Sequence, residues 1–170
     1  MKLLQSLSAK TQDAINLQFP ELRAIKENDP NSMNRVAISV FDHWLRDEAE
    51  WHLLDCYDGK ERESRDRKFL SHWQAIFEST EVYTLRYRGR WPRKSKLVIK
   101  KYLDKHGFLS QCKFDTRHSP SQFVILPEFD CIYLASWDDT NVVYFNSREK
   151  ADSIINLAKI QGLHCLEFDN

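Results

Sequence analysis

Asp138 and Asp139 are the residues of this sequence whose type and spacing come nearest to a reactive site. Two adjacent carboxylates can bind Mg²⁺ when further oxygen ligands converge on them. The pair lies in the segment "WDDTN" between two apolar segments, however, where an Asp side chain can accept hydrogen bonds from nearby backbone amides. The sequence therefore favours a hairpin turn over 138–141, with a metal site as the alternative.

Other catalytic and metal-binding signatures are sparse in this chain. There is no glycine-rich phosphate loop, no GxSxG and no HExxH segment, and only four glycines are present. The four cysteines are Cys56, Cys112, Cys131 and Cys165, with no CxxC pair among them. This spacing favours free thiols over two disulfides and does not favour zinc. We therefore predict no catalytic residues, no cofactor and no metal, and a protein that is not an enzyme.

Residues 86–101, "RYRGRWPRKSKLVIKK", carry eight basic side chains and no acidic one. The chain as a whole is formally neutral, so the remaining residues carry a net charge of −8. Three interpretations are open: a strand edge protected by charge, a surface that binds an acidic protein, or a nucleic-acid contact. Aromatic residues that could stack on bases are interleaved with the basic ones or flank them: Tyr83, Tyr87, Trp91 and Tyr102.

Charge ranks these partners. A nucleic-acid-binding domain is more often basic overall, and the acidic remainder of this chain would repel phosphate. A protein partner is therefore preferred to nucleic acid, with arginine and tryptophan side chains as its anchors. The anchors that we predict are Arg86, Arg88, Arg90, Trp91, Arg93 and Trp137.

Apolar residues recur at helical spacing in three segments, 33–45, 69–77 and 147–161. Residues 50–57 and 81–88 are expected to be strands. In the second of these, one face would carry Val82, Thr84, Arg86 and Arg88, and the other, inward face would carry Tyr83, Leu85 and Tyr87.

The segment from Pro92 to Gly107 admits two interpretations. Proline in a first turn and glycine at the end favour a helix over 97–103, although "KLVI" could also be a short strand. Residues 108–146 are expected to contain four strands, and "LHCLEF" a final one. The pattern predicts a single α+β domain over 1–170, with a mainly antiparallel sheet packed against three to five helices.

Length and hydropathy exclude some classes of protein. A chain of 170 residues with 42% hydrophobic residues is typical of one globular domain. No apolar run approaches the roughly 20 residues that span a bilayer. The first residues do not continue as a signal peptide, because Gln5, Ser6 and Ser8 interrupt the apolar start. We therefore expect a cytoplasmic protein without membrane contact.

Two segments resemble a family of small bacterial domains, some of which are encoded beside secreted toxins and act as immunity proteins. They are "NRVAISVFDHWLRDEAEWHLLDCYDG" and "IYLASWDDTNVVYF", and the closing "LEFD" is also similar. Thr140 and Asn141 stand where Arg-Gly is more usual in the family, and the middle third has no counterpart. The resemblance implies a cytoplasmic protein that occludes a toxin domain, and it brings no catalytic residues.

The function predicted from the sequence is thus a protein-binding module, an immunity protein for a bacterial toxin domain. An RNA- or DNA-binding module that uses residues 86–101 is the first alternative. A small enzyme or metal-binding protein that uses Asp138 and Asp139 is the second.

Overall fold

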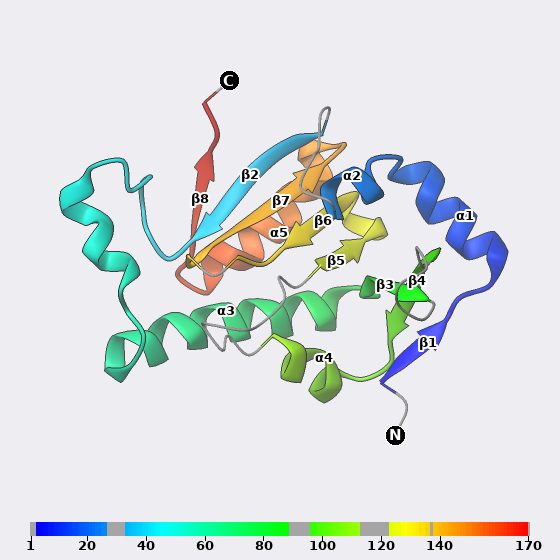
Figure 1. Ribbon diagram of the computed structural model, residues 1–170, viewed down its shortest axis with the longest axis horizontal. Helices are drawn as coiled ribbons and strands as arrows, with labels where there is room; N and C mark the ends of the chain where they lie inside the picture. Colours follow the sequence, from blue (N-terminus) through cyan, green and yellow to red (C-terminus); the bar gives the residue numbers. More distant parts are fainter. Residues whose placement is uncertain (1–2, 27–32, 89–95, 113–122, 137, 170) are drawn as a thin grey trace.

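A single antiparallel sheet organises the chain (Figure 1). The computed structural model describes residues 3–26, 33–88, 96–112, 123–136 and 138–169. Eight strands in these residues are ordered β1-β4-β3-β5-β6-β7-β2-β8, and every neighbouring pair is antiparallel. The strands are β1 Leu4–Ser6, β2 Asn34–Ser39, β3 Tyr83–Arg88, β4 Lys96–Tyr102, β5 Phe123–Leu126, β6 Cys131–Leu134, β7 Thr140–Phe145 and β8 His164–Glu167.

Helices cover both faces of the sheet, and this gives two hydrophobic clusters. The α-helices are α1 Ala9–Gln18, α2 Leu22–Lys26, α3 Gly59–Ser79, α4 Lys105–Gln111 and α5 Arg148–Ile160, and the short 3-10 helices are η1 Glu48–Leu54 and η2 Pro127–Phe129. On one face, α3, α4 and α5 bury residues such as Trp73 and Ile154 against Val143. On the other face, α1 and α2 bury Phe19 and Ile25 against the strands.

The predicted α+β class and mainly antiparallel sheet are confirmed. Two of the predicted helices are also confirmed, because Phe69, Trp73 and Ile76 are buried on α3, and Ile154 and Ile155 are buried on α5. The predicted strand over 81–88 is confirmed as β3. The prediction of a single inward face is wrong, because Val82 and Thr84 are buried as well as Tyr83 and Leu85. None of the described helices is both long and apolar enough to cross a bilayer.

The predicted helix over 33–45 is wrong, because Asn34–Ser39 is the strand β2 between β7 and β8. Residues 36–39 are all buried, since this inner strand is covered on both faces. A strand buried on both faces shows no alternation, so its apolar residues also fit a helical spacing. The β-branched Val36 and Ile38 suit the strand.

The predicted strand over 50–57 is also wrong, because Glu48–Leu54 forms η1. Asp47 begins that helix, since its Oδ1 accepts a hydrogen bond from the backbone N–H of Ala49 at 2.9 Å.

The helix preferred over 97–103 is the strand β4, which pairs with β3 over residues 96–101. The helix begins later, at Lys105, where Asp104 accepts a hydrogen bond from Gly107 N–H at 2.7 Å. This helix, α4, stands where the first of the four strands expected over 108–146 would begin. Gly107 lies inside α4, where a Cβ atom would come within 2.1 Å of Leu3 Cδ1. The glycine therefore permits close packing on the chain start rather than a helix end.

Candidate docking surface

Only one predicted anchor has a described side chain. Arg86 is exposed on β3, opposite Val98 on β4. Arg88 belongs to the same strand, but its side chain lies outside the described residues. Arg90, Trp91, Arg93 and Trp137 also lie outside them. A binding role for residues 86–101 therefore remains a prediction.

Asp138 and Asp139 have different roles. Asp138 Oδ1 accepts a hydrogen bond from Thr140 N–H at 3.3 Å, so this residue shapes the turn as predicted. Asp139 has the left-handed φ of 57°, which Asp tolerates better than most residues. Its side chain is buried, with only 4% of the residue exposed. Thr140 and Asn141, expected in the turn, already belong to β7.

Two arginines from α3 surround the Asp139 carboxylate. Arg62 donates to both of its oxygens, at 2.7 and 2.9 Å, and Arg65 Nη1 donates to Oδ2 at 3.0 Å. Arg62 and Arg65 are themselves only 7% and 6% exposed. Such buried charges are tolerated when they are paired and hydrogen-bonded, as they are here. We call these three residues the arginine–aspartate cluster.

Both arginines remain cationic in this cluster. Burial lowers the pKa of Arg62, but hydrogen bonds to Asp139 and Asp66 outweigh it, so the pKa is raised overall. For Arg65 the same opposition holds, with hydrogen bonds to Glu61 and Asp139 raising the pKa. The cluster therefore links α3 to the β6–β7 hairpin through ion pairs in which both arginines stay charged.

The same arginines hold a long segment between β2 and α3. Arg65 Nη1 donates to the Leu53 carbonyl at 2.8 Å, and Arg62 Nη1 donates to the Cys56 carbonyl at 3.4 Å. The Arg65 guanidinium also lies 5.0 Å from the Phe41 ring centroid, a cation–π geometry. We call residues 40–58 the excursion, because Figure 1 shows this segment extending away from the sheet at one end of the long axis.

The first limb of the excursion is attached to the end of the chain. Trp44 Nε1 donates to the Glu167 carbonyl at 2.8 Å, and its ring lies 4.9 Å from that of Phe168. Arg46 forms an ion pair with Asp169. The excursion is thus held at both limbs by contacts with distant parts of the chain, which limits its conformational freedom.

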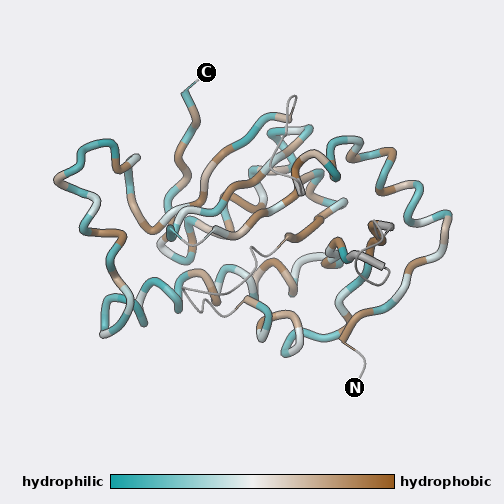
Figure 2. The backbone as a smooth tube through the Cα atoms, viewed as in Figure 1, coloured by the Kyte–Doolittle hydropathy of each residue, from teal (hydrophilic) through white to brown (hydrophobic). Residues whose placement is uncertain are grey.

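Aromatic and acidic side chains dominate the exposed part of the excursion. Trp51 is 51% exposed and Tyr57 is 53% exposed. Figure 2 shows that the segment is largely hydrophilic, and its net charge is −5 because six acidic residues stand against Arg46. The acidic residues are Asp42, Asp47, Glu48, Glu50, Asp55 and Asp58.

His43 links two parts of the excursion through hydrogen bonds at its two ring nitrogens. Its Nδ1 lies 2.5 Å from Asp42 Oδ1, and its Nε2 lies 2.7 Å from Glu50 Oε1. Two carboxylates on the two ring nitrogens favour the imidazolium, so the pKa of His43 is raised, chiefly by Glu50. The pKa of Asp42 is lowered, chiefly by its hydrogen bond to His43. This link connects the first limb of the excursion to η1.

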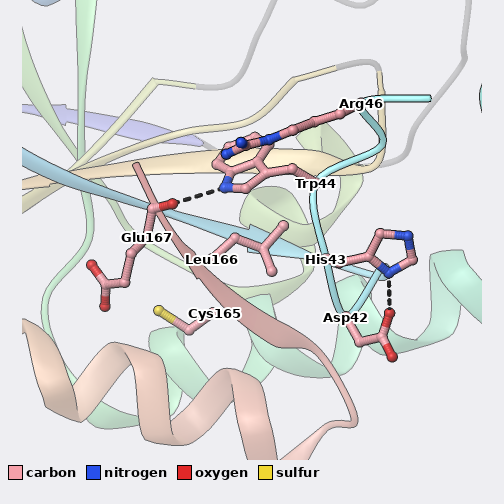
Figure 3. A pocket seen from close by; sticks show the side chains of 7 residues that line it. All are labelled: Asp42, His43, Trp44, Arg46, Cys165, Leu166 and Glu167. Atoms are coloured by element: carbon pink, nitrogen blue, oxygen red, sulfur yellow. Dashed lines mark hydrogen bonds and ion pairs between the residues drawn. The ribbon is translucent and has the colours of Figure 1, made fainter. Parts of the chain in front are cut away.

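A shallow hollow of about 390 Å³ lies between the first limb and β8 (Figure 3). It contains a histidine and a thiol, the residue types of a nucleophilic pair. Burial raises the pKa of Cys165, however, which disfavours the reactive thiolate. In Figure 3 the Cys165 sulfur points away from the His43 ring, whose nitrogens contact carboxylates. The residues that line the hollow are Asp42, His43, Trp44, Arg46, Cys165, Leu166 and Glu167.

The hollow therefore does not provide the geometry of a cysteine nucleophile with a histidine base. All four cysteines are free thiols, as the sequence predicted. In the part of the chain that the structure describes, no three His, Cys, Asp or Glu side chains are placed to hold a metal ion.

Sequence reasoning missed Arg62 and Arg65, although a signal was present. The buried positions of α3 run 62, 65, 69, 72, 73 and 76, so the two arginines continue the helical spacing of the apolar residues. Charged residues on a buried face imply a buried partner. Asp139, already singled out in the sequence, is that partner.

Comparison with known proteins identifies no relative. No family model matches the chain, and neither a curated protein nor a solved structure is significantly similar to it.

Proposed function

We propose that this chain is a protein-binding module without chemistry of its own and that the excursion is its docking surface. The observation that carries the proposal is the pair of exposed aromatic residues, Trp51 and Tyr57, on a segment held at both limbs. Aromatic side chains supply much of the binding energy at protein interfaces. A segment already ordered in the free protein loses little conformational freedom on binding.

Charge indicates the chemistry of the partner. The excursion carries a net −5, so it complements a protein surface rich in Lys and Arg. Complementary charge speeds association, and buried aromatic anchors slow dissociation. The strands β3 and β4, which bear Arg86, Lys100 and Lys101, lie toward the other end of the molecule in Figure 1.

We take the kind of partner and the cellular location that we propose from the resemblance to immunity proteins. The partner is then a bacterial toxin domain, and the complex forms in the cytoplasm. The predicted anchors belong to a second contact region in this proposal: Arg86, Arg88, Arg90, Trp91, Arg93 and Trp137.

The test takes the products of the open reading frames that neighbour the gene, purified and immobilised, as candidate partners. Trp51→Ala is expected to increase the dissociation rate at least about tenfold, the effect of losing an anchor worth about 1.4 kcal/mol or more. Leu17→Ala is the matched control, because Leu17 is an apolar residue that is 86% exposed on α1. Equal dissociation rates for the two variants, or no binding by the unmodified chain, would reject the proposal.

A further inference from the structure

His72 is fully buried on α3, yet neither ring nitrogen has a hydrogen-bond partner among the described residues. The adjacent Trp73 is also fully buried, and its indole N–H is likewise without a described partner. Three polar atoms without a partner among the described residues thus lie on one helix, in the hydrophobic layer between α3 and the sheet. The large majority of buried polar side-chain atoms in native proteins are hydrogen-bonded.

The chemical state of His72 defines what these atoms need. Burial lowers the pKa of His72 to about 3, so the ring is neutral at pH 7. A neutral imidazole has one donor nitrogen and one acceptor nitrogen, while the indole of Trp73 only donates. The site therefore needs a ligand that both donates and accepts.

A third polar group faces the same layer from the sheet. The Tyr133 ring lies 5.6 Å from that of His72 and 4.3 Å from that of Trp73, and the residue is fully buried on β6. Its hydroxyl oxygen accepts from Asn141 Nδ2 at 3.3 Å, so the hydroxyl proton is not used in that contact. Asn141 Oδ1 in turn accepts from Ser136 N–H at 2.9 Å. Two further polar groups, the Tyr133 hydroxyl and the Asn141 amide, therefore lie close to His72 and Trp73.

We propose that ordered water occupies an internal site between α3 and β6, bound by His72 and by the Trp73 indole N–H. Water is a donor and an acceptor, and buried waters typically make about three hydrogen bonds to polar groups that would otherwise be unmet. The site is separate from the excursion and does not depend on the docking proposal. It explains how a histidine and a tryptophan N–H are accommodated in this layer.

A crystal structure of the unmodified protein tests the proposal directly. We expect solvent density at roughly 2.7–3.2 Å from Nδ1 or Nε2 of His72 and within hydrogen-bond reach of Trp73 Nε1. A dry site would overturn the proposal. So would a hydrogen bond from any protein side chain to these three atoms.

Nuclear magnetic resonance gives an independent readout in solution. The Trp73 indole proton should show cross-relaxation with a long-lived water, and His72→Leu should remove that signal and lower the melting temperature. Phe69→Leu is the control, because Phe69 is buried one turn earlier on α3 and offers no polar atom. It should lower the melting temperature while the water signal stays. A higher melting temperature for His72→Leu would show that the ring nitrogens were unmet, and would overturn the proposal.

Discussion

Arg62 and Asp139 form a buried two-pronged ion pair between residues 77 positions apart in the sequence, with N–O distances of 2.7 and 2.9 Å. The pair joins α3 to the β6–β7 hairpin, and Arg65 donates to the same carboxylate. Because both arginines also hold carbonyls of the excursion, one aspartate influences the hairpin, the helix and the excursion together.

Asp139→Asn is expected to destabilise the protein by about 3 kcal/mol or more, because it leaves two buried arginines without their shared carboxylate. Asn also tolerates a left-handed φ, so the substitution removes the charge with little backbone strain. Urea unfolding followed by tryptophan fluorescence measures the change.

Asp138→Asn is the matched control for that experiment, because Asp138 contacts only the backbone N–H of Thr140 through its carboxylate in the described hairpin. Asn can make the same contact, so a change within about 0.5 kcal/mol is expected. Equal losses for the two variants would contradict the assignment of the ion pairs as the main contribution.

His72 makes stability depend on pH between about 6.5 and 3. The ordinary pKa of 6.5 applies in the unfolded chain, and burial lowers it to about 3 in the folded protein. The unfolded state therefore binds a proton first as the pH falls, and stability decreases. At pH 5 the expected loss from this residue is roughly 2 kcal/mol relative to pH 8.

Unfolding free energies at pH 8 and pH 5 measure this effect. The difference should be smaller by about that amount in His72→Leu, which has nothing to titrate. His106→Gln removes an exposed histidine and should leave most of the difference in place. An unchanged pH dependence in His72→Leu would mean that His72 can bind a proton in the folded protein.

The helices α3 and α5 were predictable from the sequence because one face of each is polar. The apolar positions of α3 and α5 recur at helical spacing because their other faces meet solvent. Asn34–Ser39 could not be recognised in this way, because an inner strand covered on both faces has no polar side. The arginine–aspartate cluster could not be predicted, because residues 62, 65 and 139 come together only in the folded chain. The excursion could not be foreseen because its attachment to residues 167–169 is tertiary.

The two carboxylates on His43 predict an imidazole that titrates above its ordinary pKa of 6.5. The contribution of this link to stability is present at low pH and is lost as the pH rises through the raised pKa. Glu50→Gln should lower the pKa of His43 more than Asp42→Asn does, because Glu50 is the larger cause. Nuclear magnetic resonance titration of the ring protons measures both. A larger effect of Asp42→Asn would contradict this order.

The four thiols should differ in their reactivity. Burial raises the pKa of Cys112 and Cys131 far above the ordinary value, and both residues are closed to solvent. A disulfide reagent at pH 8 should modify the half-buried Cys56 first and these two only as the protein unfolds. Denaturant without reductant should expose four thiols. Fewer than four would indicate a disulfide.

Binding experiments on the basic segment can distinguish a protein partner from nucleic acid. Residues 86–101 carry eight basic groups, whereas the remaining residues carry a net −8. We predict no substantial binding to random RNA or duplex DNA at about 0.15 M salt, where the Debye length is about 8 Å. If the segment binds an acidic protein surface, neutralising Arg86, Arg88, Arg90 and Arg93 together should mainly slow association, and Trp91→Ala should speed dissociation.

A gel shift at submicromolar protein would instead assign the segment to nucleic acid, if the shift weakens steeply with salt and disappears in the four-arginine variant. Counterion release produces that salt dependence. Lys10→Gln on α1, with Lys10 an exposed basic residue outside the segment, is the control that should change neither result.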